Sequence, residues 1–376
     1  MIVFKKEFLA ALNAASKFTN GTKKSMLAWD RVRIDNGTGT IIGTDLESWC
    51  TTEFTDRKSA SEESFCCGPR QLKQLIASEP GEDVVIDFDK KTMTITVGAN
   101  FKTIPVISDE TFPMPPDNPW HMNHRFVVPK ENLLSIASLP ENDRKTHYTK
   151  AVAFNDIGEV IGTDGTRVHI FQGIKPELQF KQFCLNKKVM RSASALAKEN
   201  VWVYIPVESD QYCLLSIDSN PPIKIVASIM DCEFPPVNQV FYDNGTDITV
   251  ERKELMIIVQ KAALMSDDEY RGAKVEIKDG RLTMTMTNPE RGEFQESFDV
   301  LVPKDLSFRA GINPKYCQDA INYISCGAKM TDNMPMTLSV KDNEPFIFQT
   351  ANARAAVMPI IFQTANARAA VMPMKI

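Results

Sequence analysis

The sequence predicts an α+β fold in which one repeat, two helices packed on antiparallel sheets, occurs three times. The chain has 376 residues, too many for one typical core, and three repeats would each be close to the common domain size. The same order of predicted elements can be read three times. Pro-rich segments that open with Phe-Pro separate these readings at 112–119 and 234–247. We therefore expect domains at 1–119, 120–245 and 246–376.

Each repeat opens with a short strand followed by an amphipathic helix. The three copies of this first helix are expected to begin at Lys5, Lys130 and Glu251. In the third copy apolar side chains recur at i, i+3, i+4 and i+7, namely Leu255, Ile258, Val259 and Ala262. This spacing places them on one buried face of a helix.

A strand pair around a tight turn is expected next. Asn36-Gly37 and Asp279-Gly280 are the residue pairs that favour the positive φ of a two-residue hairpin turn. A second helix is expected from Gly68, Asn186 and Asn313. Asn313-Pro314 is typical of a helix N-cap and first turn. Further strands with alternating apolar and polar residues complete each repeat, which predicts sheets with one solvated face.

Basic charge gathers on the predicted helices of an acidic protein. The net charge is −5, yet Lys and Arg outnumber Asp and Glu by 14 to 6 in the six helical segments. One interpretation is that the helices face DNA and reach phosphates. Its candidate residues are Lys23, Lys24, Arg70, Lys73, Lys187, Lys188, Arg191 and Lys198. The alternative is that these side chains merely decorate solvated helix faces.

No catalytic, metal or cofactor site is predicted. The eight cysteines include no CxxC motif, which favours reduced thiols over a disulfide framework or a zinc site, and the adjacent Cys66 and Cys67 fit a core. A Thr-Asp motif recurs at Asp45 and Asp164, whereas the third repeat has Thr-Asn, so these carboxylates are interpreted as turn caps. No stretch of about 18 uncharged apolar residues is present, so we expect a cytoplasmic protein without membrane contact.

Several motifs resemble a known family. They are GTDLE at 43–47, TDGTR at 163–167, EYRGAKVEI at 269–277, NPE at 288–290 and the terminal VMPMKI. On these residues the chain resembles, over essentially its whole length, the beta subunit of bacterial DNA polymerase III, the beta sliding clamp family. The resemblance implies a DNA-clamp fold and a ring-forming head-to-tail homodimer. It also implies that basic helices line the ring and that the ring encircles double-stranded DNA without sequence preference.

The resemblance further implies contact surfaces. Phe101, Leu264 and Met265 resemble the dimer interface. A docking pocket for replicative DNA polymerase, clamp loader and repair proteins with a clamp-binding peptide carries over to Thr149, Thr163, Gly165, Arg167, Val168, Pro235, Val240, Val371, Met372, Pro373 and Met374. Thr149 stands where the family usually has a larger apolar residue, and Thr166 where histidine is frequent. Partner preference is therefore left open.

The carboxyl end contains a tandem duplication. IFQTANARAAVMP occurs at 347–359 and again at 361–373. One copy is enough to complete the last repeat, and we expect the first copy to do so because it follows the preceding strand through a short turn. Val357, Met358 and Pro359 would then form the pocket wall, and the second copy could occupy the pocket in cis. If the second copy fills the sheet, the first becomes a loop.

Two other classes of function stay open at the level of sequence. One is a protein-interaction scaffold of the same fold that does not encircle DNA. The other is an enzyme of nucleic acid or ligand metabolism, which only the composition allows. Retention on nicked circular DNA, compared with the same DNA linearised, separates a ring from a groove binder.

Overall fold

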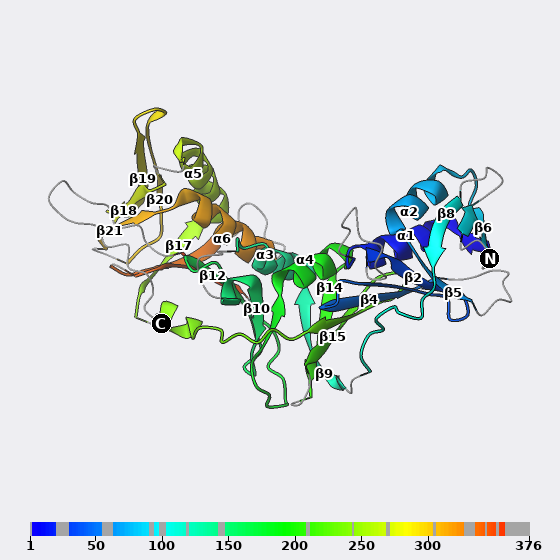
Figure 1. Ribbon diagram of the computed structural model, residues 1–376. Helices are drawn as coiled ribbons and strands as arrows, with labels where there is room; N and C mark the ends of the chain where they lie inside the picture. The colour runs from blue at the N-terminus through cyan, green and yellow to red at the C-terminus, as the bar shows by residue number, and fades with distance from the viewer. Residues whose placement is uncertain are drawn as a thin grey trace. The chain divides into compact units, whose positions relative to one another are not determined.

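The computed structural model describes residues 2–19, 30–54, 63–89, 94–97, 103–117, 120–141, 147–207, 211–242, 244–267, 271–303, 306–326, 335–342, 344–350 and 353–357. The chain forms two compact bodies (Figure 1). The amino-terminal body comprises Met1–Lys130, Pro176–Lys181 and Lys188–Met230. The carboxyl-terminal body comprises Glu131–Lys175, Gln182–Lys187 and Asp231–Ile376. The predicted second domain, 120–245, thus contributes to both bodies.

Each repeat has the same order of elements. The first consists of β1 Ile2–Phe4, α1 Lys5–Ser16, β2 Val32–Asp35, β3 Thr40–Thr44, β4 Ser48–Glu53, β5 Ser64–Cys67, α2 Pro69–Ser78, β6 Asp83–Asp89, β7 Thr94–Val97 and β8 Thr103–Ile107. The second consists of β9 Trp120–Pro129, α3 Lys130–Ala137, η2 His147–Lys150, β10 Ala151–Phe154, β11 Glu159–Thr163, β12 Arg167–Gln172, β13 Phe183–Asn186, α4 Lys187–Leu196, β14 Asn200–Pro206, β15 Tyr212–Ile217 and β16 Ile223–Ser228.

The third repeat follows the short helix η3 Val237–Val240. It consists of β17 Thr246–Glu251, α5 Arg252–Met265, β18 Ala273–Lys278, β19 Arg281–Asn288, β20 Gly292–Asp299, β21 Phe308–Ile312, α6 Pro314–Cys326, β22 Pro335–Val340, β23 Phe346–Gln349 and β24 Ala353–Val357. Among described residues, every repeat therefore has a strand, a helix, four strands, a second helix and three strands. The predicted α+β fold with a threefold repeat of helices and antiparallel strands is confirmed. The exact domain boundaries stay a prediction.

Strand pairing repeats together with element order. Within a repeat the first strand pairs with the sixth, as in β1–β6, β9–β14 and β17–β22. Between repeats the fourth strand of one pairs with the last strand of the next, as in β4–β16 and β12–β24. A 12-stranded sheet forms in the amino-terminal body, and an 8-stranded and a 4-stranded sheet form in the carboxyl-terminal body. All of these pairings are antiparallel.

Two strands lack the partner that this rule assigns to them. In the third repeat β20 is the fourth strand, and within the described residues it pairs with β19 only. In the first repeat β8 is the last strand. It pairs with β7 through Thr103–Pro105 and with β5 only through Val106 and Ile107. The chain therefore has an open fourth-strand edge near one end of its repeat series and a partly open last strand near the other.

The helices pack on the sheets through apolar faces. In the amino-terminal body Phe8, Leu12 and Ala15 of α1 are buried against the sheet, and Figure 1 shows α1 and α2 side by side above β2 and β4. Gly43 in β3 allows this approach, because a Cβ there would lie 2.0 Å from the Ala15 carbonyl oxygen. Gly162 in β11 does the same, with a Cβ 2.9 Å from the Ile136 carbonyl oxygen. These are the glycines of the two GTD motifs.

The predicted turns are right in one place and wrong in another. Asp279 and Gly280 have φ of 51° and 74°, as the two-residue hairpin requires. The prediction for Asn36-Gly37 is wrong, because Asp35 pairs with Thr40 and the loop has four residues. The Asp35 carboxylate accepts the Thr38 backbone N–H at 2.9 Å, and the positive φ falls on Gly39. A side-chain hydrogen bond thus selects the longer turn.

The first copy of the duplicated sequence fills the last sheet. Residues 346–349 form β23 and residues 353–357 form β24, which pairs with both β23 and β12. The expectation that the first copy occupies this place is confirmed, and Met358, Pro359 and the second copy lie outside the described residues. The copies differ just before the repeat, where Phe346 corresponds to Ile360. Phe346 is buried and packs edge-on against Phe308 at 5.5 Å.

We predict that Gly43→Ala strongly destabilises the protein. The added methyl group overlaps the α1 backbone, so either helix or strand has to shift, at a cost of about 3 kcal/mol. Urea unfolding of the amino-terminal body measures this cost. Gly68→Ala is the control, because a Cβ there meets nothing closer than 3.8 Å. Equal stability of the two variants would contradict the packing described for α1.

Candidate docking site and DNA-facing helices

A hydrogen-bonded turn lies at the centre of the predicted docking site. The Thr163 hydroxyl donates to the Arg167 carbonyl at 2.7 Å and accepts the Gly165 N–H at 3.0 Å. Asp164 Oδ1 accepts the Arg167 backbone N–H at 3.1 Å. Gly165 has φ of 86°, which suits glycine at this position. The Thr44 hydroxyl makes the same bonds in the first repeat, so the interpretation of these motifs as turn caps is confirmed.

Arg167 is locked in place by charge and by an aromatic ring. Its Nε donates to Asp164 Oδ2 at 2.9 Å, and its Nη1 donates to the Asp319 carboxylate. The Tyr316 ring lies 4.3 Å from the guanidinium carbon. These contacts hold β12 against α6. Because Arg167 is 5% exposed, its charge is not available to a ligand. Asp319 is 152 positions away, so no local signal could have identified the pair.

The structure brings the described members of the predicted docking site into one region of the carboxyl-terminal body. Thr149 lies in η2, and the neighbouring Tyr148 packs edge-on against Phe234 at 6.1 Å, beside Pro235. Val168 pairs with Ala356 of β24. Pro235, Val240, Val168 and Thr149 are themselves buried. These four residues therefore form the base of the candidate site and expose little surface.

A second ion pair fixes β24 beside this base. Arg354 Nη2 lies 2.6 Å from Glu159 Oε1, and Asn155 donates to the other Glu159 oxygen at 2.8 Å. The Arg354 guanidinium also lies over the Phe241 ring at 4.9 Å, next to Val240. Glu159 is 2% exposed, so hydrogen bonds and the ion pair to these partners offset the cost of burying its carboxylate. No local sequence pattern indicates this cluster, because its members come from separate segments.

The terminal wall of the predicted pocket falls on residues that the structure does not describe. Val371, Met372, Pro373 and Met374 lie outside the described residues. Val357, from the first copy, instead stands opposite Arg167 in the β12–β24 pairing. Met358 and Pro359, the other wall residues expected from the first copy, lie outside the described residues. The docking pocket therefore stays a prediction, and its described members near this position lie in β12 and β24.

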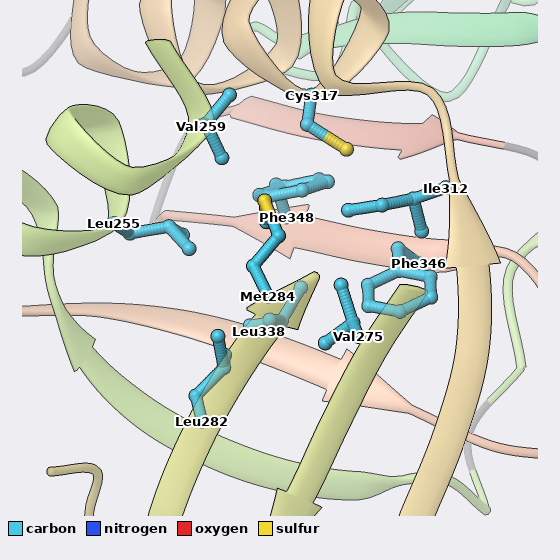
Figure 2. A pocket seen from close by; sticks show the side chains of 10 residues that line it. All are labelled: Leu255, Val259, Val275, Leu282, Met284, Ile312, Cys317, Leu338, Phe346 and Phe348. Carbon is cyan, nitrogen blue, oxygen red and sulfur yellow. The ribbon is translucent and has the colours of Figure 1, made fainter. Parts of the chain in front are cut away.

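One apolar cavity lies elsewhere, inside the third repeat. Figure 2 shows side chains of α5, α6 and the facing strands converging on it, and its volume is about 10 Å³. Its lining consists of Leu255, Val259, Val275, Leu282, Met284, Ile312, Cys317, Leu338, Phe346 and Phe348. This volume is close to the minimum that one water molecule needs, and the lining offers no polar partner. The cavity is therefore a packing gap and not a ligand site.

The predicted DNA-facing residues have different surroundings. Arg70 on α2 and Lys198 after α4 are exposed, and Arg191 is half-buried. Lys188 on α4 is 53% exposed and pairs with Asp45 at 2.7 Å. Lys73 donates to the Ser16 hydroxyl at 2.9 Å, and partial burial followed by the nearby positive charge of Lys17 lowers its pKa. Lys23 and Lys24 lie outside the described residues.

The prediction that Lys187 reaches DNA phosphates is wrong. Its side chain is fully buried, and its ammonium donates to the carbonyl oxygens of Leu139 at 3.1 Å and Thr163 at 2.9 Å. It thereby links the segment after α3 to the Thr163 turn. A lysine at the first position of a helix can point inward as readily as outward, and the sequence NKK did not distinguish Lys187 from Lys188.

The predicted dimer contact lies beside the open strand β20. Leu264 is 75% exposed, while Met265 is half-buried and its carbonyl accepts the Asn288 side-chain N–H at 2.9 Å. Arg291, the residue before β20, donates to the Leu264 carbonyl at 2.9 Å. An exposed apolar side chain is therefore fixed next to an unpaired strand edge. Phe101 lies outside the described residues.

Comparison with known proteins gives a consistent result. The family model "DNA polymerase III beta subunit, C-terminal domain" matches residues 240–354. A beta sliding clamp of Haemophilus influenzae is 21% identical over 303 residues, covering 76% of this chain and 80% of that protein. The DNA polymerase III subunit beta of Pseudomonas aeruginosa superposes with a TM-score of 0.80 at 17% identity, covering 96% of this chain and 100% of that one.

A sliding clamp of Pseudomonas aeruginosa solved with bound griselimycin also has the same fold. It superposes with a TM-score of 0.79 at 17% identity, covering 96% of this chain and 99% of that one. The repeats, the strand pairing between them and the helices on one side of the sheets define a clamp-fold protein. Residues 240–354 therefore match the carboxyl-terminal domain of DNA polymerase III beta subunits, and most of the chain is similar to bacterial beta sliding clamps.

No helix within the described residues is both long enough and apolar enough to cross a membrane.

We predict that Lys187→Met lowers the free energy of unfolding without weakening DNA retention. The change leaves two carbonyl oxygens without a donor in a buried place, which costs about 1–3 kcal/mol. Lys198→Ala is the matched variant, because the Lys198 side chain is exposed. It should leave stability within about 0.5 kcal/mol of the parent chain. Thermal unfolding and retention on nicked circular DNA, measured for both variants, check this separation. Loss of retention in Lys187→Met alone would contradict it.

Proposed function

We propose that this chain is a DNA sliding clamp that closes into a ring around duplex DNA and holds the replicative DNA polymerase on its template. It works without catalysis, as a moving tether. The single observation that carries this proposal is the strand junction between repeats, which occurs twice within the chain and leaves one half of a third junction at each end of the repeat series. A second copy of the chain can supply both missing halves.

The junction rule predicts the contact between copies. β4 pairs with β16 and β12 pairs with β24, so the fourth strand β20 of one copy should pair with the last strand β8 of the next. Such a contact is head to tail, because the two edges are different surfaces. Exposed Leu264 beside β20 supplies the apolar part of this interface. The resemblance to beta sliding clamps implies that two copies close the ring, which then contains six repeats.

Topology explains how an acidic protein stays on DNA. A protein with a net charge of −5 gains little from non-specific adhesion over its whole surface. A closed ring needs only weak contacts to phosphates, and Arg70, Lys188, Arg191 and Lys198 are described basic residues able to supply them. These contacts read no bases, so sliding stays independent of sequence. We infer a cytoplasmic location from the DNA partner, without membrane contact.

Partner docking belongs to the region around β12 and β24. A clamp of this fold binds griselimycin, which supports a ligand site on the present chain as well. We place polymerase, clamp loader and repair proteins with a clamp-binding peptide at the base formed by Val168, Pro235 and Val240. Because these residues are buried in the free protein, docking requires local opening of the segment around Pro235.

We predict that Leu264→Asp opens the ring. A charge at the centre of the apolar contact should weaken dimerisation about ten- to hundredfold. Analytical ultracentrifugation measures the dimer, and retention on nicked circular DNA measures the closed ring. Ile174→Asp is the control, because Ile174 is 91% exposed and lies outside the third repeat. The parent chain and the control should dimerise and slide off linearised DNA. A parent chain that is strictly monomeric, or equally retained on linear DNA, would show a scaffold that does not encircle DNA.

We predict that deletion of 360–373 raises affinity for griselimycin about three- to tenfold, because the surplus copy no longer competes for the docking site in cis. The deletion joins Pro359 to Met374 and leaves the described β23 and β24 intact. Deletion of 346–359 is the control. It also leaves one copy but places Ile360 where Phe346 packs against Phe308, so stability should fall by about 1 kcal/mol. Calorimetry measures the affinity for griselimycin and the stability of each deletion. Unchanged affinity in both deletions would show that the surplus copy does not occupy the docking site.

A further inference from the structure

Two cysteines from separate segments meet beside the candidate docking site. Cys184 lies in β13 and Cys232 lies in the segment that leads from β16 to η3, 48 positions later. Both belong to the carboxyl-terminal body. The Cys184 thiol donates to the Cys232 backbone carbonyl oxygen, with 3.9 Å between Sγ and oxygen. The two side chains are therefore neighbours, and each shifts the pKa of the other thiol.

The two thiols differ in access and acidity. Cys184 is 2% exposed, whereas Cys232 is half-buried and open to solvent. The hydrogen bond from Cys184 holds the pKa of the Cys232 thiol below its usual range. The same hydrogen bond, together with burial, raises the pKa of the Cys184 thiol. An accessible thiol with a lowered pKa next to a buried second thiol is the arrangement of an attacking and a resolving cysteine.

The remaining described thiols lack this arrangement. Cys50, Cys67, Cys213 and Cys317 are buried, and burial raises the pKa of each of these thiols. Cys66 is buried as well, and burial together with the nearby Asp109 carboxylate raises its pKa to about 12. Such thiols react slowly with oxidants, because the thiolate is the reactive form. Among the described cysteines, Cys232 is thus the one suited to attack.

We propose that Cys184 and Cys232 form a reversible disulfide in reaction with a low-molecular-weight disulfide such as oxidised glutathione. The Cys232 thiolate attacks one sulfur of glutathione disulfide, forms a mixed disulfide and releases one glutathione. Cys184 then gives its proton to water and attacks the Cys232 sulfur, which releases the second glutathione. The protein loses two hydrogens, and the glutathione disulfide is reduced to two thiols. Reduced glutathione in excess reverses both steps.

The disulfide would tie the base of the docking site to the sheet. Cys232 stands three positions before Pro235, and Phe234 between them packs against Tyr148 of η2. Cys184 pairs with Ala153 of β10 in the same sheet as β12. A covalent link between β13 and this segment restricts the opening that docking requires. This consequence rests on the proposed docking function, whereas formation of the disulfide does not.

The site is tested by oxidation and peptide mapping. The full-length protein is equilibrated with oxidised glutathione, alkylated and digested without reductant. We expect a 184–232 cross-linked peptide in the parent chain and in the control Cys213→Ser. Cys184→Ser should stop at a glutathione adduct on Cys232, and Cys232→Ser should form neither the cross-link nor an adduct on Cys184. Absence of the cross-link in the parent chain, or an unmodified Cys232 in Cys184→Ser, overturns the proposal.

The link to docking is tested with griselimycin. Its affinity for the oxidised parent chain should be at least about threefold lower than for the reduced chain, because the tied segment opens less readily. Cys184→Ser cannot form the cross-link. Its affinity for griselimycin should therefore change only through the glutathione adduct on Cys232, and reductant should reverse that change. Equal affinities despite a complete 184–232 cross-link overturn the effect on docking. No binding to the reduced chain in any variant would instead count against the proposed docking function, and peptide mapping still decides the disulfide.

Discussion

Antiparallel pairing between the fourth strand of one repeat and the last strand of the next is the interaction on which this molecule depends. It converts separate helix-on-sheet repeats into continuous sheets, through β4–β16 in one body and β12–β24 in the other. Paired edges protect the backbone from unwanted association, whereas an open edge attracts a partner strand. The same constraint therefore explains the internal architecture and supports the proposed pairing of β20 with a second copy.

The turn before each fourth strand connects this architecture to function. Thr163 and Asp164 close their turn with side-chain hydrogen bonds. The second carboxylate oxygen of Asp164, Oδ2, pairs with Arg167, which contacts α6. In the first repeat the corresponding Asp45 holds Lys188 of α4 instead. Each turn thus binds the second helix of the following repeat next to the strand junction. A catalytic role for these carboxylates would conflict with the hydrogen bonds and ion pairs that they already make.

The duplicated carboxyl end and the cysteine pair act on the same region. β24 comes from the first copy, and Arg354 in this strand binds Glu159 and lies over the Phe241 ring. Cys232 lies at the start of the segment that leads to Phe241, so its link to β13 restrains the opposite end of this segment. Docking at this site would therefore depend on two restraints, one from the contacts of β24 and one from the redox state of two thiols.

The sequence by itself determined the helices, the threefold order of elements and the turn role of Asp45 and Asp164, because helix periodicity, caps and turn chemistry act over a few residues. Asn313 illustrates this, since its side chain accepts the Lys315 N–H at 3.0 Å as an N-cap should. Only the tertiary structure decided which neighbouring lysine is buried, that Arg167 meets Asp319, and that Cys184 meets Cys232. These outcomes depend on which segments the sheets bring together, and such long-range proximity leaves no periodic trace in one chain.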